Sequence, residues 1–326
     1  MLEVAKNIFC FPVPLPGSPL KELNCYIIKG DKRNLMIDVG YNSPQGYKAI
    51  MDAFEELKLS ISDTDIFLTH MHADHTGLVE KLKHDCGKIY ISQPDSRHVK
   101  LSGDRDYWIN AFKRQDHMGW PMGTHFHYRD HPAWRAGNQT EIELTITSEG
   151  DIFSYGGYDF EVIDLKGHTP GQLGLYNKEH SILFSGDHIL NKISPNVTLW
   201  DFTQDYLGLF LANLLKVKAL NIKTLLSGHR SLIADVNGRI DQLLAHHERR
   251  LNRTLEILAS GKTTVYDVAL DTEWDYGGGY FGDFPGEQKW FASNETFAHL
   301  EHLRYLGKVD YTVNPKDRLT YHYQVK

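Results

Sequence analysis

The stretch from Thr69 to Gly77 reads THMHADHTG, and it holds three histidines and one aspartate within residues 70–75. Residues 65–68, just before it, predict a short buried strand, and residues 77–83, just after it, predict the start of a helix. The cluster is therefore expected on a loop that leaves the C-terminal end of a strand. This is the place where α/β folds tend to position their ligand sites.

Imidazole and carboxylate side chains are good ligands for zinc and other divalent transition metals. On an extended chain His70 and His72 point to the same side, so they can bind one ion together. Asp74 and His75 come after the chain turns and project elsewhere. Since one ion cannot comfortably take all four, the spacing predicts two neighbouring metal sites. The alternative, a polar loop with solvated histidines, fits this dense pattern less well.

Three more candidate ligands lie further along the chain, each on a glycine-containing loop after an apolar strand. They are His168 after strand 160–163, Asp187 after strand 182–184, and His229 after strand 224–226. Glycine lets the backbone turn sharply and approach a ligand closely. A lone histidine after a strand is more often structural, but three candidates in the same context favour a shared site.

These residues together resemble the metallo-β-lactamase-fold hydrolase superfamily, over roughly residues 5–235. The resemblance implies an α/β fold, a four-layer αββα sandwich with the metal site at one edge. It assigns the ligands residue by residue. His70, His72 and His168 would hold a first metal, Asp74, His75 and His229 a second, and Asp187 would bridge the two. Flavin-linked di-iron members usually carry Glu at the position of His72, which argues against that branch.

The resemblance implies two divalent ions, with zinc expected and iron or manganese as alternatives. Two such ions, about 3.5–4 Å apart, would share a hydroxide that attacks the substrate. Asp74 is expected to act in catalysis as well, by orienting this nucleophile. The expected reaction is hydrolysis of a small acyl ester or thioester, as in glyoxalase-II-like relatives. The alternatives are a phosphodiesterase or endoribonuclease, and a mononuclear iron dioxygenase acting on persulfides.

Two residues are candidates for supporting roles around the metals. Asp38 lies in an Asp-Val-Gly turn, and a similar turn buttresses the metal loop in the family; the alternative is a simple turn cap. His188 follows Asp187 directly and is expected to contact either a ligand or the substrate. Lactone-cleaving relatives often place Tyr three residues after the bridging Asp. Leu190 stands there in this chain, which argues against a lactone substrate.

At 326 residues the chain is long enough for two domains of about 150 residues each. We expect a hydrolase domain at 1–238, which includes an excursion at 95–147 rich in aromatic residues and histidine. Within it, residues 97–116 predict a helix and residues 118–137 a loop. The excursion is a candidate lid or substrate wall, or its aromatic side chains simply pack onto the body. The spacing of His125, His127 and His131 permits a further metal site.

Residues 239–326 predict three helices and a hairpin, with helices at 239–259, 263–270 and 294–306 and strands at 309–313 and 319–324. Ser293 or Asn294 is the expected N-cap of the third helix. This order resembles the winged-helix domain that follows the hydrolase fold in the β-lactamase-like-protein-2 branch. Residues 271–286, rich in Gly, Tyr and Phe, form an insertion that is long enough to reach the cleft.

The charge of this region argues against binding nucleic acid. Residues 240–326 carry ten Lys and Arg but thirteen Asp and Glu, whereas phosphate contacts need an excess of positive charge. A structural role or a role in a homodimer is favoured. The formal charge of −7 for the whole chain likewise speaks mildly against a polyanionic partner. The expected partner is a small-molecule substrate.

The remaining features of the sequence predict a cytoplasmic protein that does not enter a membrane. Cys10, Cys25 and Cys86 are scattered and form no Cys-x-x-Cys pair, so a disulfide framework is not implied and a reducing compartment is expected. The sequence contains no long apolar stretch that predicts a membrane span. The N-terminus lacks the pattern of a secretory signal.

Overall fold

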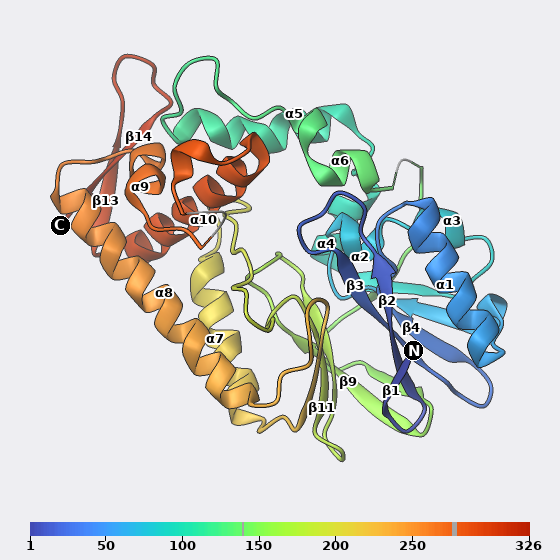
Figure 1. Cartoon of the computed structure of the whole chain (residues 1–326). Coiled ribbons are helices and arrows are strands. Elements are labelled where there is room, and N and C mark those ends of the chain that lie inside the picture. Colours follow the sequence, from blue (N-terminus) through green and yellow to red (C-terminus); the bar gives the residue numbers. More distant parts are fainter. Residues whose placement is uncertain (139, 276–278) are drawn as a thin grey trace.

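The computed structural model describes residues 1–138, 140–275 and 279–326, and it is built around two β-sheets that pack face to face (Figure 1). The first sheet has the strand order β1-β2-β3-β4-β5-β6-β7. Its strands are β1 (Leu2–Ala5), β2 (Ile8–Pro14), β3 (Glu22–Ile28), β4 (Asn34–Ile37), β5 (Thr64–Phe67), β6 (Ile89–Ser92) and β7 (Thr145–Thr147). Strands β1 to β4 pair antiparallel, and β4 to β7 pair parallel.

The second sheet has the order β12-β11-β10-β9-β8. Its strands are β8 (Ile152–Tyr155), β9 (Tyr158–Asp164), β10 (Leu173–Asn177), β11 (Ile182–Gly186) and β12 (Thr224–Ser227). Strands β8 to β11 are antiparallel, and β12 joins β11 in parallel. The ends of β5, β9, β11 and β12 lead into the loops that carry all the predicted metal ligands.

Each sheet is buried on both faces, and strand β3 shows why. Its side chains alternate: Tyr26 and Ile28 pack into the core between the sheets, while Cys25 and Ile27 face the helix side. On that side lies α1 (Pro44–Leu57), which Ser43 begins by accepting a hydrogen bond from the Gly46 amide. Helices α7 (Tyr206–Ala219) and α8 (Val236–Ala259) cover the second sheet, which gives the predicted αββα sandwich (Figure 1).

The metal loop differs in detail from the prediction, because the helix after it begins earlier. Two short helices, α2 (Ala73–Thr76) and α3 (Val79–Leu82), replace the single helix expected from residue 77. They are separate because the Leu78 amide donates to Gly40 O instead of continuing the helix. Asp74 and His75 therefore lie on a helical turn.

The excursion is more structured than expected. The helix predicted at 97–116 is interrupted: α4 (Gln93–Lys100) ends before a turn, and Asp104 caps α5 (Arg105–Phe112) by accepting from the Tyr107 amide. The expected loop contains a further helix, α6 (Pro132–Ala136). Residue 139 lies outside the described part of the chain. The function of the excursion as a lid stays a prediction.

The C-terminal part shows the expected order of three helices and a hairpin. These elements are α8, α9 (Val265–Asp271), α10 (Gly286–Tyr305), β13 (Val309–Val313) and β14 (Tyr321–Val325). The third helix starts at Gly286, so the prediction of a start near 294 was wrong. Asn294 is not a cap but is buried within the helix, where its side-chain amide donates to Trp290 O. Whether this region is a winged-helix domain stays a prediction.

The C-terminal helices share a hydrophobic core with the rest of the chain. One cluster of buried side chains contains residues from α5, α7, α8 and α10. The clearest contact joins the excursion to α10: the rings of Phe112 and Trp290 stack with centroids 4.3 Å apart and planes 12° apart. The expected boundary at 237–238 falls in the first turn of α8, which Asp235 caps. The division into domains 1–238 and 239–326 stays a prediction.

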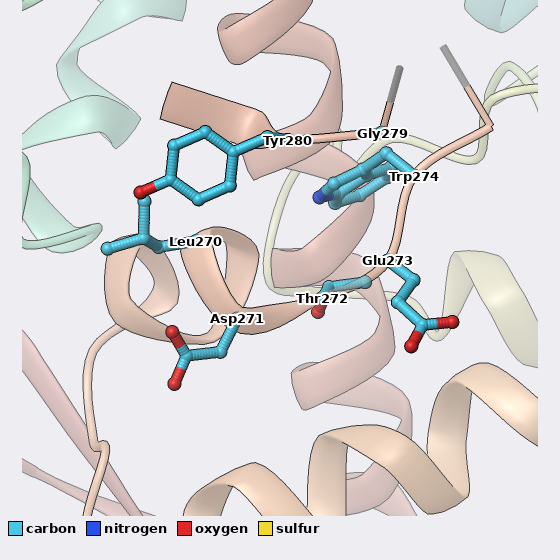
Figure 2. Close-up of a pocket in the computed structure, with 7 residues that line it drawn as sticks. All are labelled: Leu270, Asp271, Thr272, Glu273, Trp274, Gly279 and Tyr280. Atoms are coloured by element: carbon cyan, nitrogen blue, oxygen red, sulfur yellow. The ribbon is translucent and has the colours of Figure 1, made fainter. Parts of the chain in front are cut away.

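The insertion at 271–286 is described except for residues 276–278. Trp274 lies beneath the guanidinium of Arg250 in α8, which is 4.2 Å from the centre of its ring. A shallow hollow lies between Trp274, Tyr280 and the end of α9 (Figure 2). No predicted site residue lines this hollow. Among the described residues, no helix combines the length and apolar character needed to cross a membrane.

Candidate metal centre

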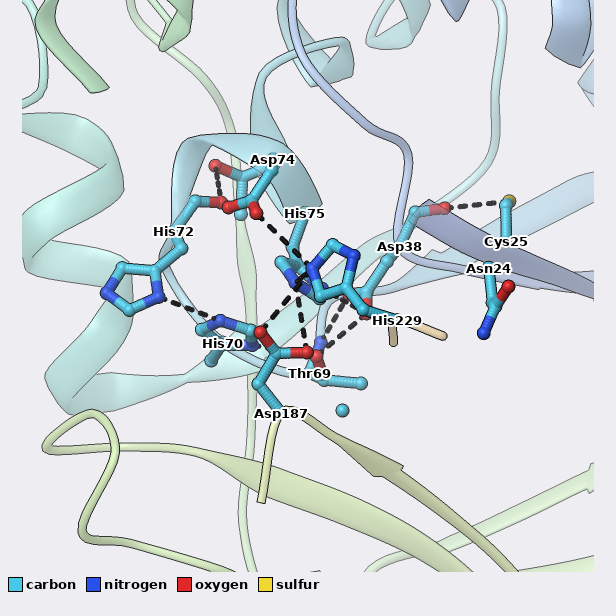
Figure 3. Close-up of polar contacts among 12 residues, drawn as sticks. Asn24, Cys25, Asp38, Thr69, His70, His72, Asp74, His75, Asp187 and His229 are labelled. Atoms are coloured by element: carbon cyan, nitrogen blue, oxygen red, sulfur yellow. Dashed lines mark hydrogen bonds and ion pairs between the residues drawn. The ribbon is translucent and has the colours of Figure 1, made fainter. Parts of the chain in front are cut away.

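The seven predicted ligands converge at one edge of the sandwich, where the loops after β5, β9, β11 and β12 meet. Figure 3 shows their side chains except that of His168. They form three overlapping groups in which one ligand atom from each residue lies within 4.8 Å of the others. The groups are His70, His72 and His168; His70, His75 and Asp187; and Asp74, His75 and His229. Only His72 and Asp74 are partly exposed, so the site opens to solvent on their side.

The first group has the geometry that a cation needs. Nδ1 of His72 lies 3.1 Å from Nε2 of His70 and 3.0 Å from Nε2 of His168. Three ring nitrogens that face one another cannot all be satisfied by hydrogen bonds among themselves, but their lone pairs can bind one ion. Burial and the neighbouring histidines lower the pKa of His72 to about 3 and that of His70 well below its usual range. Both rings are therefore neutral, which is the form that binds metal.

The second group combines charge with burial. Nε2 of His229 lies 3.3 Å from Asp74 Oδ2 and 3.3 Å from Nε2 of His75. Although burial opposes ionisation, His229 and His75 lower the pKa of Asp74 to about 2. The carboxylate is therefore ionised at neutral pH and available as a ligand.

Asp187 lies between the two groups. Its Oδ1 is 3.4 Å from Nε2 of His75, and its Oδ2 is 3.5 Å from Nε2 of His229. Oδ1 is buried and accepts no hydrogen bond from the described residues. Gly228 makes this approach possible, because a Cβ atom at that position would lie 2.4 Å from Asp187 Oδ1. A buried carboxylate oxygen without a donor fits a cation partner.

The outer nitrogen of each buried ligand histidine is held by a defined partner. Nδ1 of His75 donates to Asp38 Oδ2 (2.7 Å), that of His168 to Asn196 O (2.6 Å), and that of His229 to Glu22 O (2.8 Å). Nδ1 of His70 lies 3.0 Å from the Thr69 hydroxyl. These contacts fix the tautomer and direct each Nε2 into the cluster.

The structure places Asp38 in contact with the ligand loop, at a backbone φ of +57°. Besides His75, its carboxylate accepts hydrogen bonds from the amide and the hydroxyl of Thr69, both at 2.8 Å. One buried side chain thus orients a histidine and anchors the start of the metal loop. His188, the other predicted supporting residue, lies outside the three groups of candidate ligands. Its ring packs edge-on against Phe210 in α7, with the ring centroids 4.9 Å apart.

Sequence reasoning missed Asp95, which connects two ligand loops. Its Oδ2 accepts from the Met71 amide at 3.0 Å and from the Thr169 hydroxyl at 2.7 Å, next to His72 and His168 respectively. Burial raises the pKa of Asp95 to about 6. The one signal in the sequence is an aspartate in the first turn of a helix, and many helices share it. The backbone carbonyls of Asn196 and Glu22 accept from His168 and His229, and no side-chain pattern in the sequence could have indicated these contacts.

The histidines of the excursion form no metal group among the described residues. His131 instead packs among aromatic rings, 5.0 Å from Trp108 and 5.6 Å from Phe291 between centroids. Burial lowers its pKa to about 3. Burial likewise lowers the pKa of His299 to about 3 and that of His98 to about 4.

These buried histidines predict a loss of stability in acid. Because they are neutral in the folded protein but titrate near 6.5 in the unfolded chain, the unfolded state binds more protons below about pH 6.5. Stability should therefore fall as the pH drops from about 6.5 towards 4. Replacing His131 with Phe should remove at most about 1.4 kcal/mol of this loss per pH unit. Urea unfolding of both proteins at several pH values measures it, and parallel curves would contradict the prediction.

The sandwich and the buried cluster of histidines and aspartates at its edge define the class of protein, a metal-dependent hydrolase of the αββα type. Residues 22–229, well over half of the chain, match the family model of the metallo-beta-lactamase superfamily. The chain belongs to this superfamily. The resemblance noted from its motifs is thereby confirmed.

Individual relatives are distant in sequence but extend over much of the chain. A beta-lactamase-like protein 2 homolog of Caenorhabditis elegans is 24% identical over 268 residues, which are 78% of this chain and 73% of that protein. An atrochrysone carboxyl ACP thioesterase of Aspergillus aculeatus is 25% identical over 73% of this chain, but the match spans only 60% of its own length. A metallo-beta-lactamase family protein from Thermus thermophilus superimposes with a TM-score of 0.82 at 27% identity, over 99% of this chain and 100% of that one.

Proposed function

We propose that this chain is a two-metal hydrolase that cleaves a small acyl thioester or ester. His70, His72 and His168 hold the first divalent ion, Asp74, His75 and His229 hold the second, and Asp187 lies between both. The observation that carries the proposal is the convergence of all seven buried or half-buried ligand atoms. Zinc is the expected metal, with iron or manganese as alternatives, because histidine and carboxylate ligands accept all three.

The divalent ions would lower the pKa of water towards neutrality and polarise the carbonyl of the substrate. The chain itself positions the reactants. Asp74 is ionised, partly exposed and on the open side, so it can accept a hydrogen bond from the attacking water and orient it. His70, His75 and His229 are fully buried, so we expect the substrate to approach from the side of the partly exposed His72 and Asp74.

An acyl substrate is supported by two observations. The relative from Aspergillus aculeatus is named as a thioesterase. The partly exposed His72 also lies beside the indole of Trp200, with the two ring centroids 6.0 Å apart. An indole beside the site suits a partly apolar acyl group. A nucleic-acid substrate is disfavoured by the acidic balance of residues 240–326.

The test is a parallel measurement of initial rates on metal-loaded protein. An acyl thioester, an acyl lactone and an activated phosphodiester are compared under the same conditions, each with and without oxygen, and with a chelator-treated sample as blank. We expect turnover of the thioester that disappears with the chelator and returns with added zinc. Turnover of the phosphodiester alone would contradict the proposal, as would an activity that requires oxygen.

A further inference from the structure

The ligand His168 is enclosed by the segment that joins β11 to α7. The Nδ1 of His168 donates to Asn196 O. The backbone carbonyl of His168 accepts a hydrogen bond from the indole N–H of Trp200 at 3.1 Å. Residues 191–205 contain no helix or strand, so this segment cannot hold its own shape through regular backbone hydrogen bonds. Something else has to fix the carbonyl that orients His168.

The C-terminal helices supply that support. The side-chain amide of Asn196 donates to Glu295 Oε2 at 3.0 Å and to Phe291 O at 3.2 Å, both in α10. Glu295 Oε1 in turn accepts from Arg250 of α8 at 2.8 Å. Side chains from two helices far along the sequence thus reach a metal ligand through a single asparagine.

The ion pair between Arg250 and Glu295 is largely buried, because each side chain is only 10% exposed. Desolvating two charges is expensive, and apolar side chains in their place are often equally stable or more so. A gain in folding stability is therefore a weak explanation for the presence of this ion pair. A carboxylate held rigidly between Arg250 and Asn196 does, however, fix the position of the segment beside His168.

We infer that Asn196, Glu295 and Arg250 are positioning residues for His168, so that α8 and α10 set the affinity of the first metal site. The inference rests on the role of His168 as a metal ligand in the proposed function. Groups that hold ligand histidines typically change metal affinity by about 10–100-fold when they are removed. The second site, held by Asp74, His75 and His229, has its own partners and should be affected much less.

The experiment uses the full-length protein with Asn196→Ala as the main variant. This change removes the hydrogen bonds to α10, together with the one that Asn196 Oδ1 accepts from the Thr198 hydroxyl, and it leaves both side chains of the Arg250–Glu295 ion pair in place. Cobalt(II) is titrated into metal-free protein, and the visible absorption reports the two sites. We expect one of the two binding steps to weaken by about 10–100-fold while the other stays within about threefold.

A matched pair of substitutions in α10 separates positioning from general stability. Glu295→Gln leaves a single acceptor oxygen where Arg250 and Asn196 each donate to one carboxylate oxygen, so the side chain can no longer satisfy both. Glu301→Gln removes the same charge from the same helix. Glu301 is also buried and paired with an arginine, Arg304, but its other partner is the hydroxyl of Tyr323 in β14. Glu295→Gln should weaken one cobalt site, and Glu301→Gln should weaken neither.

Cobalt binding like that of the wild type in both Asn196→Ala and Glu295→Gln would overturn the inference. Equal weakening by Glu301→Gln would overturn it too, because the effect would then follow from a loosened helix. His168→Ala gives the separate check on the proposed function. If that variant keeps both cobalt sites, the ligand assignment itself fails, whereas its loss of one site together with silent Asn196 and Glu295 variants refutes the positioning role alone.

Discussion

Replacing Asp187 with alanine should reduce kcat/KM by far more than 100-fold and leave the fold intact. The loss should exceed the roughly 10–100-fold seen for groups that only support a ligand, because the Asp187 carboxylate itself faces both metal groups. It lies within 3.5 Å of ring nitrogens of His75 and His229. Its buried Oδ1 accepts no hydrogen bond from the described residues, so the substitution breaks none at that oxygen.

The measurement compares initial rates and circular dichroism for Asp187→Ala, His72→Ala and a control. Asp31→Ala serves as the control, because Asp31 is exposed in the turn between β3 and β4. Both ligand variants should keep the spectrum of the folded protein and lose most of the activity, and the control should keep both. An undiminished rate in Asp187→Ala or His72→Ala with metal present would refute the ligand assignment.

Replacing Asp38 with alanine should destabilise the protein and weaken the second metal site together. The change deprives the Thr69 amide, the Thr69 hydroxyl and His75 Nδ1 of their shared acceptor in a buried position. Removing one partner from a buried charged network typically costs about 3–5 kcal/mol. Metal affinity at the site that contains His75 should fall by about 10–100-fold as well.

Denaturant unfolding and cobalt titration measure the two effects of Asp38→Ala, and Asp38→Asn separates their causes. Asparagine tolerates the positive φ of this turn, whereas alanine adds strain of about 1–2 kcal/mol. The asparagine also keeps one acceptor oxygen. The Asp38→Asn protein should therefore lose less stability than the Asp38→Ala protein, but its second metal site should still be weakened. An Asp38→Ala protein with wild-type stability and wild-type cobalt affinity would show that Asp38 is only a turn residue.

The convergence of the seven candidate ligands was predictable from the sequence because each candidate is a side chain with a local signature. The spacing of His70, His72, Asp74 and His75 limits how they can project, and the later ligands follow strands whose ends meet at one edge. The supporting contacts lack such signatures. The partner of His168 is a backbone carbonyl, Asn196 O, and any residue type offers one.

The start of α10 shows where local rules fail. Ser293 and Asn294 have the composition of a helix cap, but both are fully buried in the helix interior. Asn294 satisfies its amide by bonding to Trp290 O one turn earlier, so the helix continues through it. Trp290, in the second turn of the helix, is buried by tertiary contacts such as its stack with Phe112, and these two residues are far apart in the sequence. A local pattern cannot show such a contact.

The central claim is that this cluster binds two metal ions. It is tested most directly by anomalous diffraction from a crystal of zinc-loaded protein, with data collected on both sides of the zinc absorption edge. The account predicts two anomalous peaks, one among His70, His72 and His168 and one among Asp74, His75 and His229, with Asp187 between them. A single peak within the first group, or peaks only outside the cluster, would contradict it.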